Sequence, residues 1–337
     1  MYVCMCVCVV VVCGSAGDAD YSFRHCVRHC LDHDNSLPHS LTHSTSDSSS
    51  SSGSSSNSDT DHSPYYDIYL RDILQWDRVS ECEYSCMRSI SENRIENNLP
   101  VLKYFGHWPY YRVLGLQEPA SALFSLLNAL PHVYHISYNR HHISEILRYW
   151  IVSYGIMATI AWICSTIFHS RKVPITIFLD YSSALMFLIF GLFVAIRRTF
   201  HYSLFRLYPL VSFILFTGMA LVCLSRVCGM YEGRIGFDNH MTFSICVAVA
   251  HTAVWIMWLI ASPRESKSHK LQCLFLQLWF IAASMLELFD FPPIWYHFDA
   301  HSLWHLTTIP LGHLWYKFWF QDAIVMKKLE AEMKKVA

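Results

Sequence analysis

Charged residues are scarce in this sequence of 337 residues. Only 15% of the residues are Asp, Glu, Lys or Arg, and 53% are hydrophobic, whereas soluble domains carry about 25% charged residues. So few charges cannot cover a water-facing surface, which argues against an ordinary soluble enzyme. An excess of positive charge is also lacking, since the formal net charge is −1. We therefore expect no nucleic-acid partner.

After Glu118 the hydrophobic residues form seven runs of about 20 residues. Each run is long enough to cross a hydrocarbon core of about 30 Å as a helix. The runs cover residues 119–138, 149–169, 175–196, 207–225, 243–262, 271–289 and 299–320. Pro131 and His132 interrupt the first run, so six spans is the alternative. The pattern predicts an all-α membrane protein whose residues 118–320 form a seven-transmembrane helix bundle.

Basic residues set the expected orientation of this bundle. They gather in alternate connections and in the tail, at Arg140, Arg148, Arg197, Arg198, Arg206, Arg264, Lys267, Lys270, Lys327, Lys328, Lys334 and Lys335. The opposite connections hold only Arg171, Lys172, Arg226 and Arg234. Because positive charges concentrate on the cytosolic side, we expect a cytosolic C-terminus and a luminal N-terminal region.

The N-terminal region combines three kinds of sequence. Residues 1–17 are apolar and end in small residues, which is typical of a secretory signal peptide cleaved near Gly17. They lack a positively charged start, so an uncleaved anchor is the alternative. Residues 18–117 are polar and are expected to be luminal. Within them, nine serines between positions 48 and 58 predict a disordered insertion over about 44–63, since such a tract buries too little apolar surface.

The luminal region contains four cysteines in two pairs, each spaced by four residues: Cys26, Cys30, Cys82 and Cys86. An oxidising lumen favours disulfides, and three connectivities are open. If both segments are helical, each pair lies on one face and the two helices can be cross-linked. The alternative is a zinc site, because three histidines surround the first pair: His25, His29 and His33.

The tail, residues 321–337, ends in Lys334-Lys335-Val336-Ala337. Two lysines at these positions of a cytosolic C-terminus resemble the dilysine retrieval signal of early secretory-pathway membrane proteins. This predicts coat-protein binding and residence in the Golgi or endoplasmic reticulum membrane. The alternative is a short solvated basic helix, because Glu330 and Glu332 are interleaved with the lysines.

Several polar residues lie at the expected luminal ends of the spans, where ionisable groups are costly and therefore functional candidates. They are Ser165 and His169 at the end of the second run, Asp180 at the start of the third, and Asp299, His301 and His305 at the start of the seventh. A spacing of four places two such residues on one helix face. We expect these side chains to meet at one depth in the bundle.

Three imidazoles with an open fourth position form a hydrolytic zinc site, and zinc lowers the pKa of bound water to about 7. His169, His301 and His305 are the candidate ligands. Asp180 would take the proton of the water, and Ser165 would stabilise the oxyanion or orient the water. One alternative is a Ser165 nucleophile activated by His169. Another is that the histidines only bond to neighbouring backbone.

These residues lie in segments that resemble a known family. Residues 287–310 resemble the signature of the post-GPI-attachment lipid-remodelling proteins, which are GPI-specific phospholipase A2-like. Further similar segments are residues 82–87, 106–112, 117–122, 168–171 and 179–181. The family belongs to the CREST superfamily of seven-span hydrolases, with the alkaline ceramidases and the progestin/adiponectin-type receptors. Its motif is reproduced by Ser165, His169, Asp180, His301 and His305.

The resemblance implies a specific reaction. Zinc held by the three histidines, with Asp180 and Ser165 at the water, would remove the unsaturated sn-2 acyl chain from the phosphatidylinositol of GPI-anchored proteins. The site would face the Golgi lumen, with GPI-anchored proteins and membrane lipids as partners. Glu118 corresponds to an acidic position near the site in relatives. The other functions we considered are a ceramidase-like amide hydrolase and a non-catalytic seven-span receptor or chaperone for GPI proteins.

The sequence also departs from this family. Lys172 and Ile177 stand where relatives usually have acids, which puts headgroup recognition in doubt. Asn35 and Arg78 stand near the places of two further luminal cysteines. Neither departure touches a proposed zinc ligand.

Overall fold

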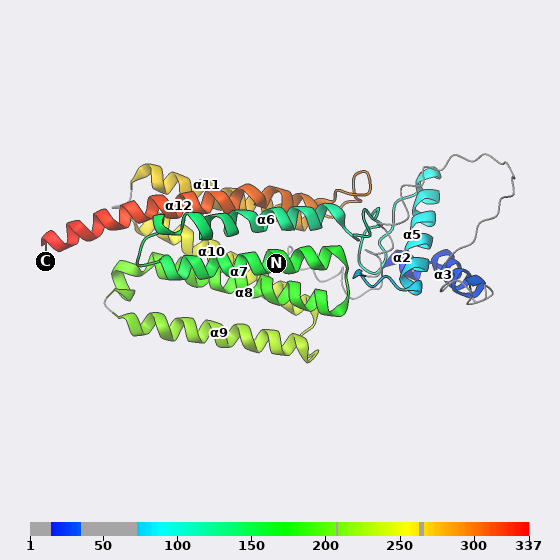
Figure 1. Ribbon diagram of the computed structural model, residues 1–337, viewed down its shortest axis with the longest axis horizontal. Helices are drawn as coiled ribbons and strands as arrows, with labels where there is room; N and C mark the ends of the chain where they lie inside the picture. Colours follow the sequence, from blue (N-terminus) through cyan, green and yellow to red (C-terminus); the bar gives the residue numbers. More distant parts are fainter. Residues whose placement is uncertain (1–14, 35–72, 207, 263–265, 337) are drawn as a thin grey trace, which may run out of the picture. The chain divides into compact units, whose positions relative to one another are not determined.

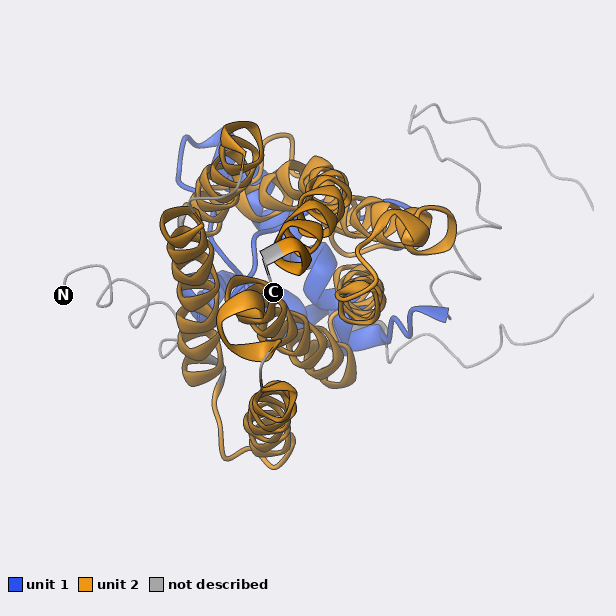
Figure 2. Cartoon of the chain, turned by 90° about the vertical axis from the view of Figure 1, so that its left-hand side faces the viewer, with its two compact units in different colours: residues 1–115 blue, residues 116–337 orange. Residues whose placement is uncertain are grey.

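The computed structural model describes residues 15–34, 73–206, 208–262 and 266–336, and it divides into two compact units. Unit 1 comprises Met1–Gly115 and unit 2 comprises Leu116–Ala337 (Figure 2). All regular elements among the described residues are helices, and strand pairing there is limited to isolated bridges. The prediction of an all-α protein is confirmed. The signal sequence and the Ser-rich insertion lie largely or wholly outside the described residues and remain predictions.

Unit 1 is built on two helices that are joined by two disulfides. The helices are α3 (Tyr21–Asp34) and α5 (Arg78–Glu96), and the short α2 (Ala16–Ala19) precedes them. Cys26 pairs with Cys86, and Cys30 pairs with Cys82. The first cysteine of each helix therefore meets the second of the other, so the helices are antiparallel. The disulfide prediction is confirmed, and none of the four sulfurs is left as a thiolate for zinc.

Unit 2 contains seven long helices among its described residues, and they run side by side (Figure 1). They are α6 (Pro119–Tyr138), α7 (Arg148–Ser170), α8 (Pro174–Thr199), α9 (Pro209–Tyr231), α10 (Phe237–Ala261), α11 (Lys267–Leu288) and α12 (Ala300–Val336). Single turns follow α6 and α8, at η1 (Arg140–His142) and η2 (His201–Phe205). Three of the helices begin with proline, whose fixed φ suits the first helical position.

Four of these helices, α7 to α10, are long and apolar enough to cross a membrane. Helix α6 is not among these four, because polar residues line one of its faces. Its residues Ser121, Ser125, Asn128, His132 and His135 recur every three or four positions and are all buried. The opposite face exposes leucines and other apolar side chains, including Leu123, Leu126 and Leu130. These buried polar groups lower the mean hydropathy of α6 below that of the four candidate spans.

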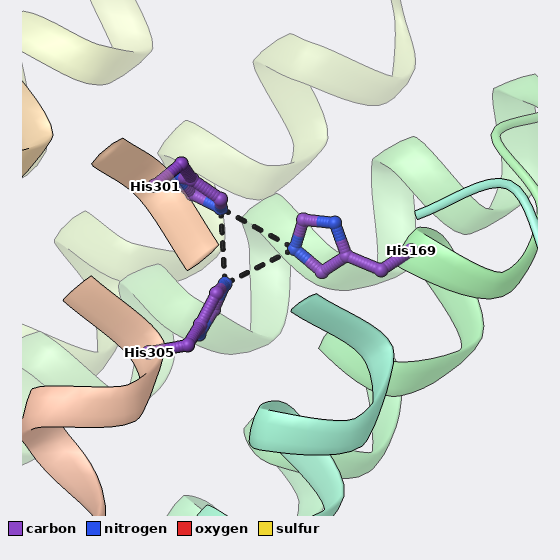
Figure 3. Close-up of side chains that lie close together, drawn as sticks. All are labelled: His169, His301 and His305. Carbon is purple, nitrogen blue, oxygen red and sulfur yellow. Dashed lines mark hydrogen bonds between the residues drawn. The ribbon is translucent and has the colours of Figure 1, made fainter. Parts of the chain in front are cut away.

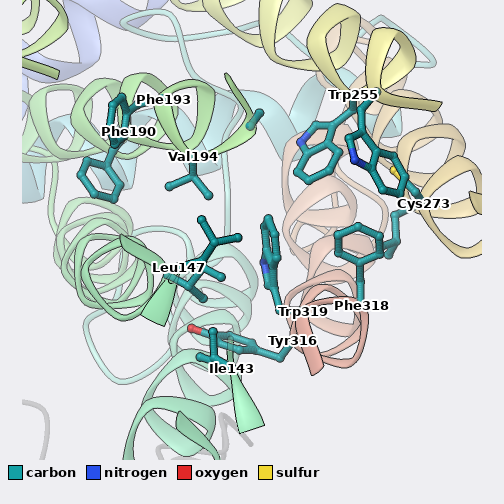
Figure 4. Packing of buried hydrophobic residues seen from close by; sticks show 14 of the residues in the cluster. Ile143, Leu147, Phe190, Phe193, Val194, Trp255, Cys273, Tyr316, Phe318 and Trp319 are labelled. Atoms are coloured by element: carbon teal, nitrogen blue, oxygen red, sulfur yellow. The ribbon is translucent and has the colours of Figure 1, made fainter. Parts of the chain in front are cut away.

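A large apolar cluster joins α7, α8, α10, α11 and α12. Trp255, Phe193, Phe318 and Cys273 are almost fully buried in it (Figure 4). The five cysteines of unit 2 carry no disulfide; Cys223 and Cys273 are buried, and Cys228 and Cys246 are exposed.

Helix α12 extends well past the predicted span of residues 299–320. Its later turns remain attached to the bundle, because Asp322 and Met326 are buried. The carboxylate of Asp322 accepts hydrogen bonds from Nε and Nη2 of Arg198 in α8. Its Oδ1 also lies 3.1 Å from Nε2 of His269 in α11. Lys334 and Lys335 lie in the last turn of α12, so the basic segment is helical.

Candidate metal centre

Three imidazoles converge where the end of α7 meets the start of α12 (Figure 3). The Nε2 atom of His169 lies 3.3 Å from that of His301 and 3.1 Å from that of His305. The Nε2 atoms of His301 and His305 are 3.0 Å apart. His169 and His305 are 1% and 2% exposed, and His301 is partly buried. The fold thus brings together the three histidines that the sequence singles out.

The start of α12 fixes the position of two of these rings. Asp299 precedes the helix, and its Oδ1 accepts a hydrogen bond of 2.9 Å from the backbone N–H of Ser302. The Ser302 hydroxyl in turn accepts a hydrogen bond of 2.9 Å from the N–H of Asp299. This reciprocal cap satisfies two N–H groups at the helix start. It sets His301 in the first turn and His305 one turn later on the same face.

Glu118 anchors the ring of His169. Its Oε2 accepts a hydrogen bond of 2.6 Å from Nδ1 of His169, and its Oε1 one of 2.5 Å from Nζ of Lys172. The segment is further held by a backbone hydrogen bond of 2.9 Å from the N–H of Glu118 to the carbonyl of His169. Since Nδ1 of His169 carries the proton, the lone pair of Nε2 faces the other two imidazoles. Carboxylate partners of this kind orient metal-binding histidines.

Glu287, in the last turn of α11, orients the ring of His301 in the same way. Its Oε2 accepts a hydrogen bond of 2.7 Å from Nδ1 of His301, and both side chains are about one-third exposed. The sequence had not singled out Glu287 as a site residue. The signal that could have identified Glu287 is its position as an acidic residue near the end of the apolar run 271–289. Nδ1 of His305 is buried and has no hydrogen-bond partner in the described part of the chain.

The arrangement fits a bound metal ion. Two Nε2 lone pairs that face each other at 3.3 Å, as in His169 and His301, repel each other unless a metal ion or a shared proton lies between them. In a tetrahedral zinc site with Zn–N of about 2.0–2.1 Å, ligand nitrogens stand about 3.3–3.4 Å apart. The separations of 3.0–3.3 Å are close to this value. A set of three imidazoles suits zinc and several other transition metals.

Ser165 and Asp180 lie beside the three imidazoles. The hydroxyl of Ser165, one turn before His169, is 3.1 Å from that of Ser125 in α6. The carboxylate of Asp180, near the start of α8, interacts with Ser165 and, through its charge, with His301. The five residues of the family motif therefore gather at one end of unit 2, together with Asp299 and Glu118, which the sequence also indicated, and with Glu287, which it did not.

Helix α6 supports the centre from one side. Nδ2 of Asn128 donates hydrogen bonds of 2.8 Å to the carbonyl of His305 and 2.9 Å to that of Phe124. Asn128 therefore ties α12 to α6 at the level of the metal centre. Lys172, a departure from the family pattern, is paired with Glu118, and its Nζ lies 4.9 Å from the centre of the Phe168 ring.

Comparison with known proteins gives a consistent result. The model of the Per1-like family matches residues 68–323. The chain is 31% identical to post-GPI attachment to proteins factor 3 of Drosophila melanogaster, over 73% of this chain and 74% of that protein. It is 27% identical to GPI-specific phospholipase A2-like PGAP3 of Xenopus tropicalis, over 80% and 84%. It is 29% identical to the PER1 homolog of Schizosaccharomyces pombe, over 73% and 75%. No solved structure matches the chain.

Proposed function

The chain belongs to the Per1-like family, and on this premise we propose that it remodels GPI anchors by removing the sn-2 acyl chain from their phosphatidylinositol. Relatives in the family carry the names post-GPI attachment factor and GPI-specific phospholipase A2-like protein. The observation that carries the proposal is the convergence of three imidazole Nε2 atoms at 3.0–3.3 Å. Such a centre suits hydrolysis of an ester by activated water.

We assign the metal ligands to His169, His301 and His305, and the metal to zinc. Bound zinc would supply Lewis-acid activation of water at neutral pH. Glu118 and Glu287 hold two of the rings in the orientation and tautomer that present Nε2 to the ion. Asn128 holds the third through the backbone of His305.

Asp180 and Ser165 carry the proposed proton transfer and charge stabilisation. Water adds to the ester carbonyl carbon while the carboxylate of Asp180 takes its proton. The hydroxyl of Ser165 donates a hydrogen bond to the oxyanion that develops on the carbonyl oxygen. The bond from the carbonyl carbon to the sn-2 oxygen then breaks, and Asp180 returns the proton to that oxygen. The products are a fatty acid and a lyso-lipid anchor.

The proposed setting follows from the charge distribution along the chain. All seven helices α6 to α12 would span the membrane, with the metal centre near the luminal surface and α12 ending in the cytosol. Residues 1–17 would act as the signal peptide. Lys334 and Lys335 would bind coat proteins for retrieval, and the protein would then reside in the Golgi or endoplasmic reticulum membrane.

The deciding experiment is rescue of cells that lack this remodelling step. The measured quantity is the fraction of unsaturated sn-2 chains on their GPI-anchored proteins. We expect rescue by the wild type and by His142→Ala, an exposed histidine of η1, and no rescue by His301→Ala or Asp180→Ala. Equal rescue by all variants would favour the chaperone function instead. Metal analysis of the purified protein should find about one zinc per chain; none under non-chelating conditions would remove the mechanism.

A further inference from the structure

A groove lies between α10 and α11, away from the metal centre. The groove is open to the outside of the bundle, and its volume is about 580 Å³. Five aliphatic and two basic residues line it: Ile256, Leu259, Ile260, Lys267, Lys270, Leu271 and Leu274. The groove is thus apolar along its length and positively charged on one helix.

The groove and the metal centre lie at opposite ends of α11. Glu287, in the last turn of α11, contacts His301 of the metal centre, whereas Lys267 is the first residue of the helix. At 1.5 Å per residue, Lys270 and Glu287 are separated by about 26 Å along the helix. Figure 1 shows the start of α11 at the same end of the bundle as the C-terminus. A ligand in the groove is therefore separate from the substrate at the metal centre.

Lys267 and Lys270 lie at the N-terminal end of α11, where a positive charge destabilises a helix. Lys267 and Lys270 lie in the first turn and at the start of the second turn of α11, and the first turn contains no acid. The N-terminal end of a helix carries a partial positive charge, so cations there are destabilising and anions are stabilising. An anionic group between the lysines would reverse this effect, and phosphate is a common ligand of helix N-termini.

The remaining groove residues present an apolar surface. Ile256 and Ile260 are one turn apart on α10, and Leu271 and Leu274 share a face of α11 with the lysines. Ile260 is 79% exposed and Leu271 is 55% exposed. A ligand that matches both the two lysines and the apolar surface has an anionic head group and a hydrocarbon chain.

We propose that this groove binds an anionic glycerophospholipid, with its phosphate between Lys267 and Lys270 and an acyl chain against Ile256, Ile260 and Leu274. In the proposed orientation this end faces the cytosolic leaflet, which is rich in anionic lipids. Basic pockets between membrane helices on that side bind anionic head groups.

The bound lipid also has a structural consequence. His269 lies between the two lysines in the sequence, and its Nε2 is 3.1 Å from Oδ1 of Asp322, which pairs with Arg198. The first turns of α11 are thus the point at which α8, α11 and α12 are tied together. A lipid that holds this segment stabilises the contact of α11 with α12, the helix that carries two of the three histidines of the metal centre.

The test is native mass spectrometry of the full-length protein in detergent, titrated with dioleoyl-phosphatidylserine or dioleoyl-phosphatidylcholine. The wild type should retain phosphatidylserine in preference to phosphatidylcholine. Lys267→Gln/Lys270→Gln should weaken phosphatidylserine binding on the order of thirty-fold, from the loss of two lysine contacts near the membrane surface. Leu274→Trp, which fills the apolar part, should weaken binding as well.

The matched control is Lys327→Gln/Lys328→Gln, which removes the same charge from two exposed lysines of α12. It should bind phosphatidylserine as the wild type does. Equal retention of the two lipids by the wild type would overturn the proposal. Wild-type binding by Lys267→Gln/Lys270→Gln or by Leu274→Trp would also overturn it, as would an equal loss in the control.

Discussion

Glu118 and His169 are 51 positions apart in the sequence, and Oε2 of the glutamate accepts a hydrogen bond of 2.6 Å from Nδ1 of the histidine. The same carboxylate pairs with Lys172, and Glu118 is only 4% exposed. A buried carboxylate held between a lysine and an imidazole has a fixed position. It therefore controls the orientation of the His169 ring, and we expect it to control metal affinity.

Replacing Glu118 should weaken zinc binding without removing a ligand. Glu118→Gln keeps an oxygen that accepts the hydrogen bond from His169, but it removes the charge that pairs with Lys172. Loss of such a partner typically lowers metal affinity about 10- to 100-fold. Competition with a chromophoric chelator on the purified protein measures this affinity. Glu118→Ala, which removes the acceptor as well, should bind zinc more weakly still.

The matched control for this prediction is Glu145→Gln, an exposed glutamate between η1 and α7. It should bind zinc with wild-type affinity. If Glu118→Gln also binds zinc with wild-type affinity, Glu118 does not control the site.

The buried ion pair of Arg198 and Asp322 gives a second prediction, on stability. The two side chains are 2% and 1% exposed. Arg198→Met leaves the Asp322 charge buried beside His269, and such a change costs about 3–5 kcal/mol. The double variant Arg198→Met/Asp322→Leu removes both charges and should recover much of the loss. Unfolding in detergent, followed by circular dichroism against denaturant, measures both; equal losses in the single and double variants would contradict this account.

Much of the fold follows from local sequence pattern. Each apolar run without charges, such as residues 149–169, corresponds to a long helix of unit 2, because length and apolarity act within one segment. Pro131 does not end α6, although it interrupts the pattern. The apolar pattern does not predict the later turns of α12. Their lysines are exposed, and the turns stay attached because Asp322 and Met326 are buried against helices that are distant in the sequence.

In the candidate site, too, the sequence predicts the local features but not the contacts between distant segments. The spacing of His301 and His305 is a local feature and identifies them as neighbours on one face. The partner of each Nδ1 atom depends on tertiary packing, so the sequence could not assign Glu287 to His301. Similarly, equal spacing in both cysteine pairs left three connectivities, and only the antiparallel packing of α3 and α5 selects one.

The disulfide connectivity gives a third prediction. Cys26→Ser/Cys86→Ser removes one complete bridge and should leave Cys30 bonded to Cys82. Peptide mapping without reductant should then find no free thiol at either remaining cysteine. Loss of one bridge should lower the stability of unit 1 by about 2–5 kcal/mol. Cys26→Ser/Cys82→Ser is the comparison, since it breaks both bridges and should expose thiols at Cys30 and Cys86; a new Cys30–Cys86 bridge in its place would contradict the selected pairing.

Close packing of α7 against α6 and α12 depends on Gly155. A Cβ atom there would collide with the Tyr316 hydroxyl and lie 2.6 Å from Cδ1 of Ile136, so Gly155→Ala should lower the free energy of unfolding by about 1–3 kcal/mol. Gly218→Ala, with nothing within 4 Å, should instead gain about 0.5–1 kcal/mol from helix propensity. Tyr316→Phe removes the nearest colliding atom, so Gly155→Ala/Tyr316→Phe should lose less than the sum of the single losses. Denaturant unfolding of the wild type, Gly155→Ala, Tyr316→Phe and the double variant measures this coupling. If Gly155→Ala gains stability as Gly218→Ala does, the helices can separate at this point without cost.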